Sequence, residues 1–372
     1  MEEFAIGIVR FMALRLVPWA LFCALACASC TGDRAPGPSC HNAQSNDKSV
    51  HASVGVPATM DAEWWGMGGD DTEMIWVDAG EFWMGATDDD QALPREFPAQ
   101  RVRLDGFFMD AHEVTNAQFA AFVEATGYVT VAERVFASAQ GEVAPGSMVF
   151  RQPNEIFNLR DHGQWWQWIT GASWKHPIGG EGGLDSLAQH PVVHVAHEDA
   201  MAYAHWRGGR LPTEAEWEFA ARGGRDRQVY PWGSEDPETG DAKCNIWEGR
   251  FPVKNELRDG FVAAAPVMTY PPNSLGFYDM AGNVWEWCSD WYSSRHYRER
   301  QRAETLSNPL GPDTCHDPMD AMTPKRVIRG GSFLCNPSYC ASYRVSARMP
   351  AAFDTGTNHI GFRCVRGASA PD

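Results

Sequence analysis

The chain has 372 residues, enough for one large domain or two ordinary ones, and 44% of them are hydrophobic. Its formal net charge is −17, and no run of Lys or Arg interrupts the acidity, so no nucleic-acid partner is expected. The 16 Trp, 35 Gly and 24 Pro residues indicate a loop-rich fold held together by aromatic packing. There is no βαβ alternation, phosphate-binding loop or Gly-x-Ser-x-Gly motif, which disfavours a parallel α/β fold and nucleotide chemistry.

The N-terminus is typical of an export signal. Arg10 and Arg15 precede an apolar stretch, 16–28, that is short for a membrane span. Cys30 follows small residues, as in a lipoprotein attachment site, and a plain cleaved signal is the alternative. Residues 31–72 are polar and rich in Pro and Gly, which predicts a disordered tether after a signal at 1–30. A single domain at 73–368 of an exported protein is therefore expected, periplasmic or held at the cell envelope by a lipid.

Three helices are expected in this domain. The first begins at Thr115, where Thr115 and Gln118 form a capping box, and ends at Gly127. The second covers about 198–207, and the third begins after Thr213 and ends at 223–224.

Several short strands are expected around these helices. Residues 74–77 and 82–85 are predicted to pair as a hairpin across the turn at 78–80. Residues 137–190, which contain four Trp, are expected to form an irregular packed surface region. The remaining strand candidates are 102–104, 107–109, 284–287, 326–328, 343–347 and 361–365.

Two of the six cysteines of this domain, Cys335 and Cys340, are close in sequence. In an extended strand they would lie roughly 16 Å apart, but the Asn-Pro-Ser turn at 336–338 folds the chain back and lets the sulfurs meet. Two thiolates select Cu(I), or zinc with further ligands. A structural disulfide or a redox-active one is the alternative. The other four are Cys244, Cys288, Cys315 and Cys364, whose pairing the sequence leaves open.

Other residues offer competing metal sites. His190, His194 and His197 have suitable spacing, but the surrounding valines predict an extended segment, so hydrogen-bonded or solvent-facing histidines are expected there. Turns rich in carboxylate and carbonyl oxygen, at 245–246 with 259–261 and at 279–284, suggest calcium. Ordinary Asx-turns are the alternative for these segments.

Several motifs spread over about 74–366 together resemble the formylglycine-generating enzymes, also called sulfatase-modifying factors. They include Arg-Leu-Pro-Thr-Glu-Ala-Glu-Trp at 210–217, Gly-Asn-Val-Trp-Glu-Trp at 282–287, Arg-Gly-Gly-Ser-Phe at 329–333 and Gly-Phe-Arg-Cys at 361–364. Cys335 and Cys340 stand where active members of that family carry their two catalytic cysteines, and Tyr339 and Arg344 also match.

This resemblance implies a single mixed α+β domain of low regular secondary-structure content, distantly related to C-type lectins. It implies Cu(I) held by Cys335 and Cys340, O2 as a co-substrate near Trp285 and Ser332, and an external thiol as reductant. The client would be an unfolded sulfatase segment of the Cys-x-Pro-x-Arg type, whose cysteine becomes formylglycine. The implied calcium ligands are Asn245, Ile246, Asp259 and Phe261 at one site, Asp279, Gly282 and Val284 at another, and Glu113 at a further acidic position.

The chain also departs from the family pattern. Ala204, Ala221 and Val345 replace three of the four cysteines that form two disulfides in animal members, which points to a bacterial type and leaves Cys364 without its usual partner. His359 stands where an Asn often contacts substrate, and His197 replaces a Trp.

Two other functions compete with the oxidase. One is a non-catalytic calcium- or peptide-binding module on the same scaffold. The other is a non-haem iron sulfoxide synthase of the ergothioneine type, for which the required helical domain and His-x3-His-x-Glu motif are missing. A monomer is expected, with membrane contact only through the lipid anchor.

Overall fold

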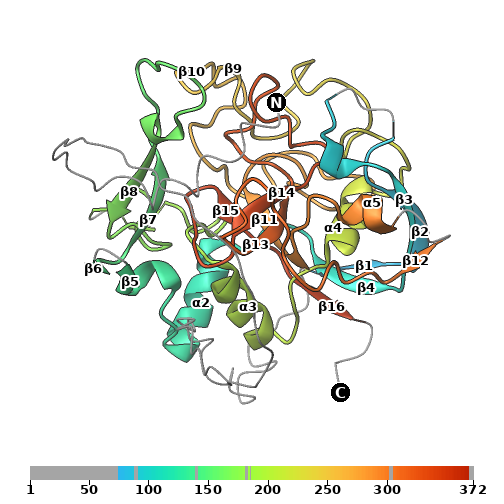
Figure 1. The fold of residues 1–372 in the computed structure, drawn as a ribbon, viewed down its shortest axis with the longest axis horizontal. Coiled ribbons are helices and arrows are strands. Elements are labelled where there is room, and N and C mark those ends of the chain that lie inside the picture. The colour runs from blue at the N-terminus through green and yellow to red at the C-terminus, as the bar shows by residue number, and fades with distance from the viewer. Residues whose placement is uncertain are drawn as a thin grey trace, which may run out of the picture.

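Short strands joined by long loops make up most of the fold (Figure 1). The computed structural model describes residues 74–87, 91–138, 141–180, 183–184, 186–300 and 305–367. The predicted signal (1–30) and tether (31–72) lie outside these residues, as do 73 and 368 at the ends of the predicted domain. Within the described part, no helix has the length and apolar character needed to cross a membrane.

A four-stranded sheet of order β14-β13-β11-β15 occupies the centre of the molecule (Figure 1). β11 pairs antiparallel with β13, which pairs antiparallel with β14, and β15 adds parallel to β11. The strands are β11 (Trp285–Trp291), β13 (Lys325–Arg329), β14 (Met349–Ala352) and β15 (Ile360–Gly361).

The strand predicted at 343–347 is wrong, because these residues form turns. The buried Arg329 side chain donates hydrogen bonds to the carbonyls of Val345 and Ser346, which therefore do not join a strand ladder. The strand β14 begins only after this segment, at Met349.

Two three-stranded sheets, β1-β4-β16 and β12-β3-β2, flank the centre. The predicted hairpin between the first two strands does not form, because β1 pairs with β4 and β2 pairs with β3. Trp76 of β1 packs against Phe108 of β4, with ring centroids 4.9 Å apart. The strands are β1 (Met74–Val77), β4 (Phe107–Asp110), β16 (Val365–Gly367), β2 (Gly80–Met84), β3 (Gln100–Leu104) and β12 (Leu306–Ser307).

The helices follow the capping signals in the sequence. Thr115 accepts a hydrogen bond from the Gln118 amide at the start of α2 (Asn116–Thr126), which ends at the left-handed Gly127 (φ 67°). α4 (Glu214–Arg222) begins in the same way at Thr213 and ends at Gly223. The remaining helices are α3 (His197–Trp206), α5 (His296–Arg300) and the 3-10 turns η3 (Pro94–Glu96), η4 (Val131–Glu133) and η5 (His162–Gln164).

Part of residues 137–190 is more regular and more buried than predicted. β7 (Gly146–Phe150) is buried along its whole length and pairs with β8 (Trp166–Thr170), while Trp165 is fully enclosed. Trp165, Trp166 and Trp174 belong to the core, whereas residues 151–161 are irregular and largely exposed, as predicted. Two smaller hairpins are β5 (Phe136–Ser138) with β6 (Gly141–Val143) and β9 (Gly249–Arg250) with β10 (Lys254–Asn255).

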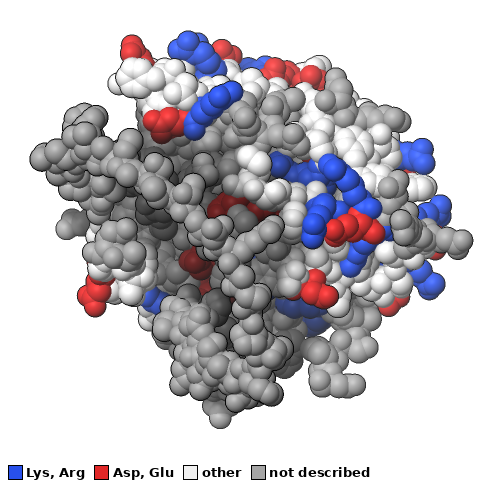
Figure 2. All heavy atoms as spheres, viewed as in Figure 1, with Lys and Arg blue, Asp and Glu red and all other residues white. Residues whose placement is uncertain are grey.

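Helix α4 is joined to the central sheet by a buried ionic network. Glu214 accepts hydrogen bonds from Arg348 (2.6 and 2.8 Å) and from Arg329 (2.9 Å), and Glu218 accepts from Arg329 and Arg222. All of these side chains are at most 3% exposed, so each charge depends on its partners for solvation. The surface in Figure 2, by contrast, shows Lys and Arg interspersed with Asp and Glu.

Candidate active site

The thiols of Cys335 and Cys340 meet in the loop that connects β13 to β14. Their sulfurs lie 2.9 Å apart, and both are free cysteines. The predicted turn brings them together, since the amides of Tyr339 and Cys340 donate to the Asn336 carbonyl (3.0 and 2.8 Å). The site is thus an unbridged, hydrogen-bonded pair of thiols.

The two sulfurs differ in acidity. The hydrogen bond from Cys335 lowers the pKa of Cys340 to about 7, helped by the Ser342 hydroxyl and opposed by burial. Burial, together with its role as the donor to Cys340, raises the pKa of Cys335 well above the usual thiol range. Cys340 is therefore the first of the two sulfurs to lose its proton as pH rises, and Cys335 is the hydrogen-bond donor to it.

Backbone contacts fix the position of this loop. The Asn336 side chain donates to the carbonyls of Trp247 and Gly249, both at 3.0 Å, and the Trp247 amide donates to the Cys335 carbonyl at 2.9 Å. Gly331 precedes the pair with φ 77°, and a Cβ atom there would come within 2.9 Å of the Ser342 backbone. Glycine is required at this position because the chain passes so close to itself.

A cluster of aromatic rings, the aromatic wall, packs around Tyr339, the residue that directly precedes Cys340. Tyr339 stacks on Phe251 (centroids 4.1 Å, 15° between planes) and meets the edge of Trp165 at 6.2 Å. Trp247 contacts Phe251 edge-on at 5.3 Å. Trp165, Trp247 and Phe251 were not among the predicted site residues, because they come from segments distant in sequence and their spacing carries no signal of the site.

His359 links Ser332 of the cysteine loop to Trp285 of β11. The Ser332 hydroxyl and His359 Nδ1 are 3.2 Å apart, and the Ser332 carbonyl accepts from the Cys335 amide at 2.8 Å. The buried Trp285 donates its amide to the His359 carbonyl at 2.9 Å. Burial, with a smaller effect of the nearby His194, lowers the pKa of His359 to about 3, so this ring is neutral.

The Arg344 side chain is buried and pairs with a buried carboxylate. Its guanidinium forms a two-pronged ion pair with Glu96 (2.7 and 2.8 Å), and its Nε donates to the Ala341 carbonyl at 2.8 Å. Arg344 therefore positions the residue that follows Cys340.

The first predicted calcium group is assembled in the structure. The Asp259 carboxylate accepts hydrogen bonds from the amides of Ile246 (3.1 Å) and Phe261 (3.0 Å). Asn245 Oδ1 is buried without a hydrogen-bond partner, and burial raises the pKa of Asp259 to about 6. An amide oxygen without a hydrogen-bond partner and a buried carboxylate in the same group are suitable ligands for calcium, which binds oxygen atoms.

The second predicted group lies beside the first. Asn283 connects them, because its amide nitrogen donates to Glu113 (3.1 Å) and its oxygen accepts from Asn245 (3.2 Å). Gly282 is required here, since a Cβ atom would come within 2.3 Å of the Asn245 carbonyl. Asp279 is buried next to Gly282 and Val284, and burial raises its pKa to about 6.

Glu113 is the least compensated of these carboxylates. Its Oε2 is buried without a partner, and burial followed by repulsion from Asp279 and Glu286 raises its pKa well above the usual value. Among the described residues, no three His, Cys, Asp or Glu side chains converge on one metal position. A cation at either group would therefore depend on amide and backbone oxygens.

Two of the three clustered histidines make structural hydrogen bonds, as predicted, whereas the buried Nδ1 atom of His190 has no hydrogen-bond partner. His194 pairs with the Ser147 hydroxyl and the Pro177 carbonyl, both at 2.8 Å, and His197 contacts the Cys288 carbonyl at 3.1 Å. Within the described chain, no disulfide joins the six cysteines.

The structure is a loop-rich mixed α+β domain with two adjacent free thiols that follow a glycine pair. The chain belongs to the sulfatase-modifying factor family, because residues 68–368 match the sulfatase-modifying factor enzyme 1-like domain. The resemblance recognised in the sequence, and the single domain of low regular content that it implied, are confirmed.

Relatives of established and of lost activity both match this chain. A formylglycine-generating enzyme of Mycobacterium tuberculosis is 44% identical over 300 residues, which cover 79% of this chain and 97% of that protein. A mouse protein named inactive C-alpha-formylglycine-generating enzyme 2 is 37% identical, covering 81% of this chain and 88% of that protein. The solved structure of PvdO from Pseudomonas aeruginosa superposes with a TM-score of 0.55 at 26% identity, covering 81% and 98% of the two chains.

Proposed function

We propose that this chain is an oxidase that converts a cysteine in a client sulfatase into formylglycine, using copper and dioxygen. The observation that carries the proposal is the pair of free sulfurs of Cys335 and Cys340, which lie 2.9 Å apart. The names of the curated relatives support the same reaction.

The donor set fits a soft monovalent metal. Cys335 and Cys340 would hold Cu(I), since two adjacent sulfurs are ligands that this ion prefers over harder cations. When bound, Cu(I) supplies the one-electron chemistry by which dioxygen reacts with a thiol. The acidity of Cys340 makes it the first of the two sulfurs available to a metal, while Cys335 must give up its proton on binding.

The overall reaction balances with a thiol reductant. The client Cβ loses one hydrogen and its bond to sulfur, the sulfur leaves as hydrogen sulfide after a thioaldehyde is hydrolysed, and an aldehyde remains. Dioxygen is reduced, and two external thiols supply the remaining electrons and protons by forming a disulfide. Ser332 and the neutral His359 lie beside the pair and hold the polar side of the site in place.

The aromatic wall makes one side of the proposed site apolar. Tyr339, which directly precedes Cys340, stacks on the buried Phe251, so a client segment bound beside these rings would displace water from the sulfurs. Desolvation strengthens the interaction of the Cys340 thiolate with its partners. We propose that Asn245, Asp259 and their neighbours hold calcium, which would fix the segment that contacts Asn336.

The test is mass spectrometry of a Cys-x-Pro-x-Arg peptide after incubation with copper-loaded protein, oxygen and a thiol. We expect the peptide to lose about 18 Da, the difference between a thiol side chain and an aldehyde. The Cys335→Ser protein should leave the peptide unchanged, and Cys315→Ser, outside the pair, should convert it normally. Conversion by the Cys335→Ser protein would contradict the proposal.

A non-catalytic binding module is the second candidate, and the inactive mouse relative favours it. Such a module would bind the client without needing its thiols, so a Cys335→Ser/Cys340→Ser protein would bind the peptide as the parent does while neither converts it. The export signal, lipid anchor and monomeric state remain predictions, which intact mass of the mature protein and its sedimentation would test.

A further inference from the structure

Ser342 contacts both thiols of the candidate active site. Its amide donates hydrogen bonds to the sulfurs of Cys335 and Cys340, and its hydroxyl donates a further one to the sulfur of Cys340. The residue is only 4% exposed, so water hardly competes for these donors. Two donors of a single residue therefore converge on the pair of sulfurs.

Gly331 makes room for Ser342 beside the thiols. A Cβ atom on Gly331 would come within 2.9 Å of both the Ser342 carbonyl carbon and the Tyr343 amide nitrogen. A side chain at position 331 would therefore displace Ser342. The glycine that precedes the cysteine loop thus allows a second segment of the same loop to lie close to the sulfurs.

The buried ion pair of Glu96 and Arg344 holds the other side of the same peptide bond. Arg344 Nε donates to the Ala341 carbonyl at 2.8 Å, and the guanidinium is fixed by the Glu96 carboxylate at 2.7 and 2.8 Å. The carbonyl oxygen and the amide hydrogen of a trans peptide point in opposite directions. A carbonyl of Ala341 that is held by Arg344 therefore directs the Ser342 amide towards the thiols.

We propose that Ser342 is a positioning residue that holds the sulfurs of Cys335 and Cys340 side by side, and that the Glu96–Arg344 ion pair orients its amide. The sulfurs that it contacts are unbridged and lie 2.9 Å apart. The contact itself does not depend on the proposed function. Its contribution to peptide conversion rests on that function, because the conversion requires two sulfurs in a defined arrangement.

Amide hydrogen exchange of the full chain, resolved to single residues by NMR, tests the contact. In Cys335→Ala/Cys340→Ala the Ser342 amide loses its acceptors, so its exchange should become about tenfold faster. The nearby Val345 amide donates to the Val229 carbonyl at 2.9 Å and should keep its parental rate. An unchanged rate at Ser342, or equal acceleration at Ser342 and Val345, would overturn the contact.

The same measurement tests the ion pair. Glu96→Gln removes the charge that fixes Arg344, so the Ser342 amide should again exchange faster than in the parent protein. A parental rate at Ser342 in this variant would show that the ion pair does not orient the amide.

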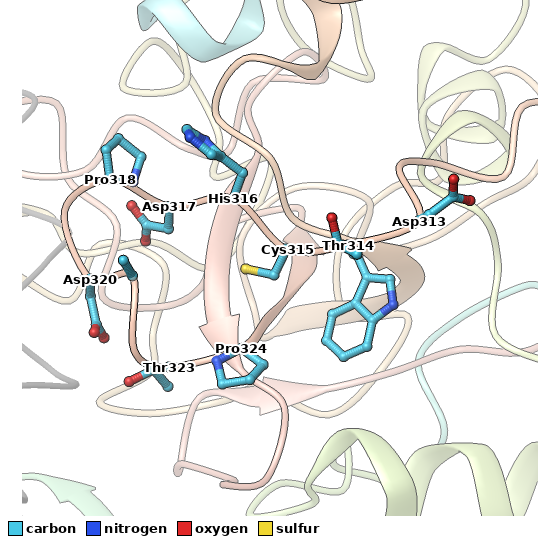
Figure 3. Close-up of a pocket in the computed structure, with 11 residues that line it drawn as sticks. Asp313, Thr314, Cys315, His316, Asp317, Pro318, Asp320, Thr323 and Pro324 are labelled. Atoms are coloured by element: carbon cyan, nitrogen blue, oxygen red, sulfur yellow. The ribbon is translucent and has the colours of Figure 1, made fainter. Parts of the chain in front are cut away.

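A cysteine outside the site provides a matched control. Cys315 lies on the wall of a pocket of about 410 Å³ in the loop between β12 and β13 (Figure 3). Its sulfur accepts a hydrogen bond from the Lys325 amide at 3.3 Å. Cys315→Ala should therefore accelerate exchange of the Lys325 amide and leave that of Ser342 unchanged. Acceleration at Ser342 in this variant would show that its exchange does not report on the thiol pair.

Peptide kinetics test the positioning role. Ser342→Ala should lower kcat for the client peptide about tenfold and leave KM unchanged, because the sulfurs are displaced rather than the peptide. Ser342→Thr keeps the hydroxyl and should restore most of kcat, and Ser173→Ala, at the same 4% exposure, should match the parent. A parental kcat in Ser342→Ala, or an equal loss in Ser342→Thr, would overturn the positioning role.

Failure of the proposed function is distinguishable from failure of this inference. A parent protein that converts no peptide would contradict the oxidase, while hydrogen exchange would still decide whether Ser342 contacts the thiols. Conversely, peptide conversion by a protein whose Ser342 amide does not respond to loss of the sulfurs would remove only the inference about Ser342.

Discussion

The imidazole of His359 is hydrogen-bonded to the hydroxyl of Ser332, with Nδ1 and Oγ 3.2 Å apart. The same hydroxyl accepts the Leu334 amide at 3.3 Å, so Ser332 is held at two points immediately before the thiol pair. The ring also makes an edge contact with Trp166 of β8, with centroids 4.8 Å apart. His359, which directly precedes β15, therefore connects β8 with the cysteine loop.

Replacement of His359 by Ala should lower kcat/KM for the client peptide about tenfold, because a lost hydrogen bond near 1.4 kcal/mol corresponds to that factor. His359→Asn should retain most activity, since its amide can reach Ser332. Peptide kinetics on both variants provide the measurement. Parental kcat/KM in His359→Ala would show that the contact does not position Ser332.

Alkylation of metal-free protein should distinguish the two thiols. The pKa of Cys340 is lowered to about 7 chiefly by the Cys335 hydrogen bond, so the rate of its reaction with iodoacetamide should rise as pH passes 7. Cys335, which is 1% exposed and has a raised pKa, should stay unmodified. Peptide mapping gives both rates. Cys335→Ala removes the hydrogen-bond donor, so the midpoint of the curve of Cys340 alkylation rate against pH should move to higher pH. An unchanged midpoint would contradict the prediction.

Loss of Arg344 should destabilise the fold. Burial opposes ionisation of Glu96, but the hydrogen bonds and charge of Arg344 keep its pKa below the usual 4.5. Arg344→Ala leaves a buried carboxylate unpaired and should lower the free energy of unfolding by about 3–5 kcal/mol.

The same ion pair sets a pH dependence. Because the pKa of Glu96 is lower in the folded state, the stabilisation is present above pH 4.5 and is lost as pH falls below it. Urea denaturation at pH 7 and at lower pH measures both effects, with the surface ion-pair variant Arg101→Ala as the control. Equal stability of Arg344→Ala and Arg101→Ala would contradict the prediction.

Calcium should raise the melting temperature of the protein. A ligand at 100 times its Kd adds about 2.7 kcal/mol, which corresponds to several degrees for a domain of this size. Excess chelator should reverse the shift. Asn245→Ala removes the orphaned amide oxygen and should abolish it, whereas Glu142→Gln on the exposed strand β6 should not. A calcium response that survives in Asn245→Ala would place the ion elsewhere.

Local chemistry explains which features could be predicted from the sequence. The capping boxes at Thr115 and Thr213 specify helices within four residues, and the turn at Asn336 brings two thiols together across five. Strand pairing could not be predicted in this way, because it is not decided by local sequence. β1 and β2 are neighbours in sequence, yet each pairs with a more distant strand.

The residues that surround the thiols could not be predicted either, because they come from distant parts of the sequence. Phe251 and Trp165 reach Tyr339 from segments nearly 90 and 175 residues away, and only the folded core decides that they meet. His359 could be noticed as a departure from the family pattern, but its bond to Ser332 depends on the register of β15 with β11. Non-local packing therefore limits what spacing alone can show.

The ionic network of helix α4 has a mechanical consequence for the thiol loop. Arg329 forms ion pairs with Glu214 and Glu218 and immediately precedes Gly330. The residue at which the loop leaves the sheet is therefore held in place. The turn at 336–338 is more open to solvent, with Ser338 exposed. The ionic network thus ties the start of the loop, with Ser332, to helix α4, so that a variant that loosens the helix should also displace the hydroxyl that faces His359.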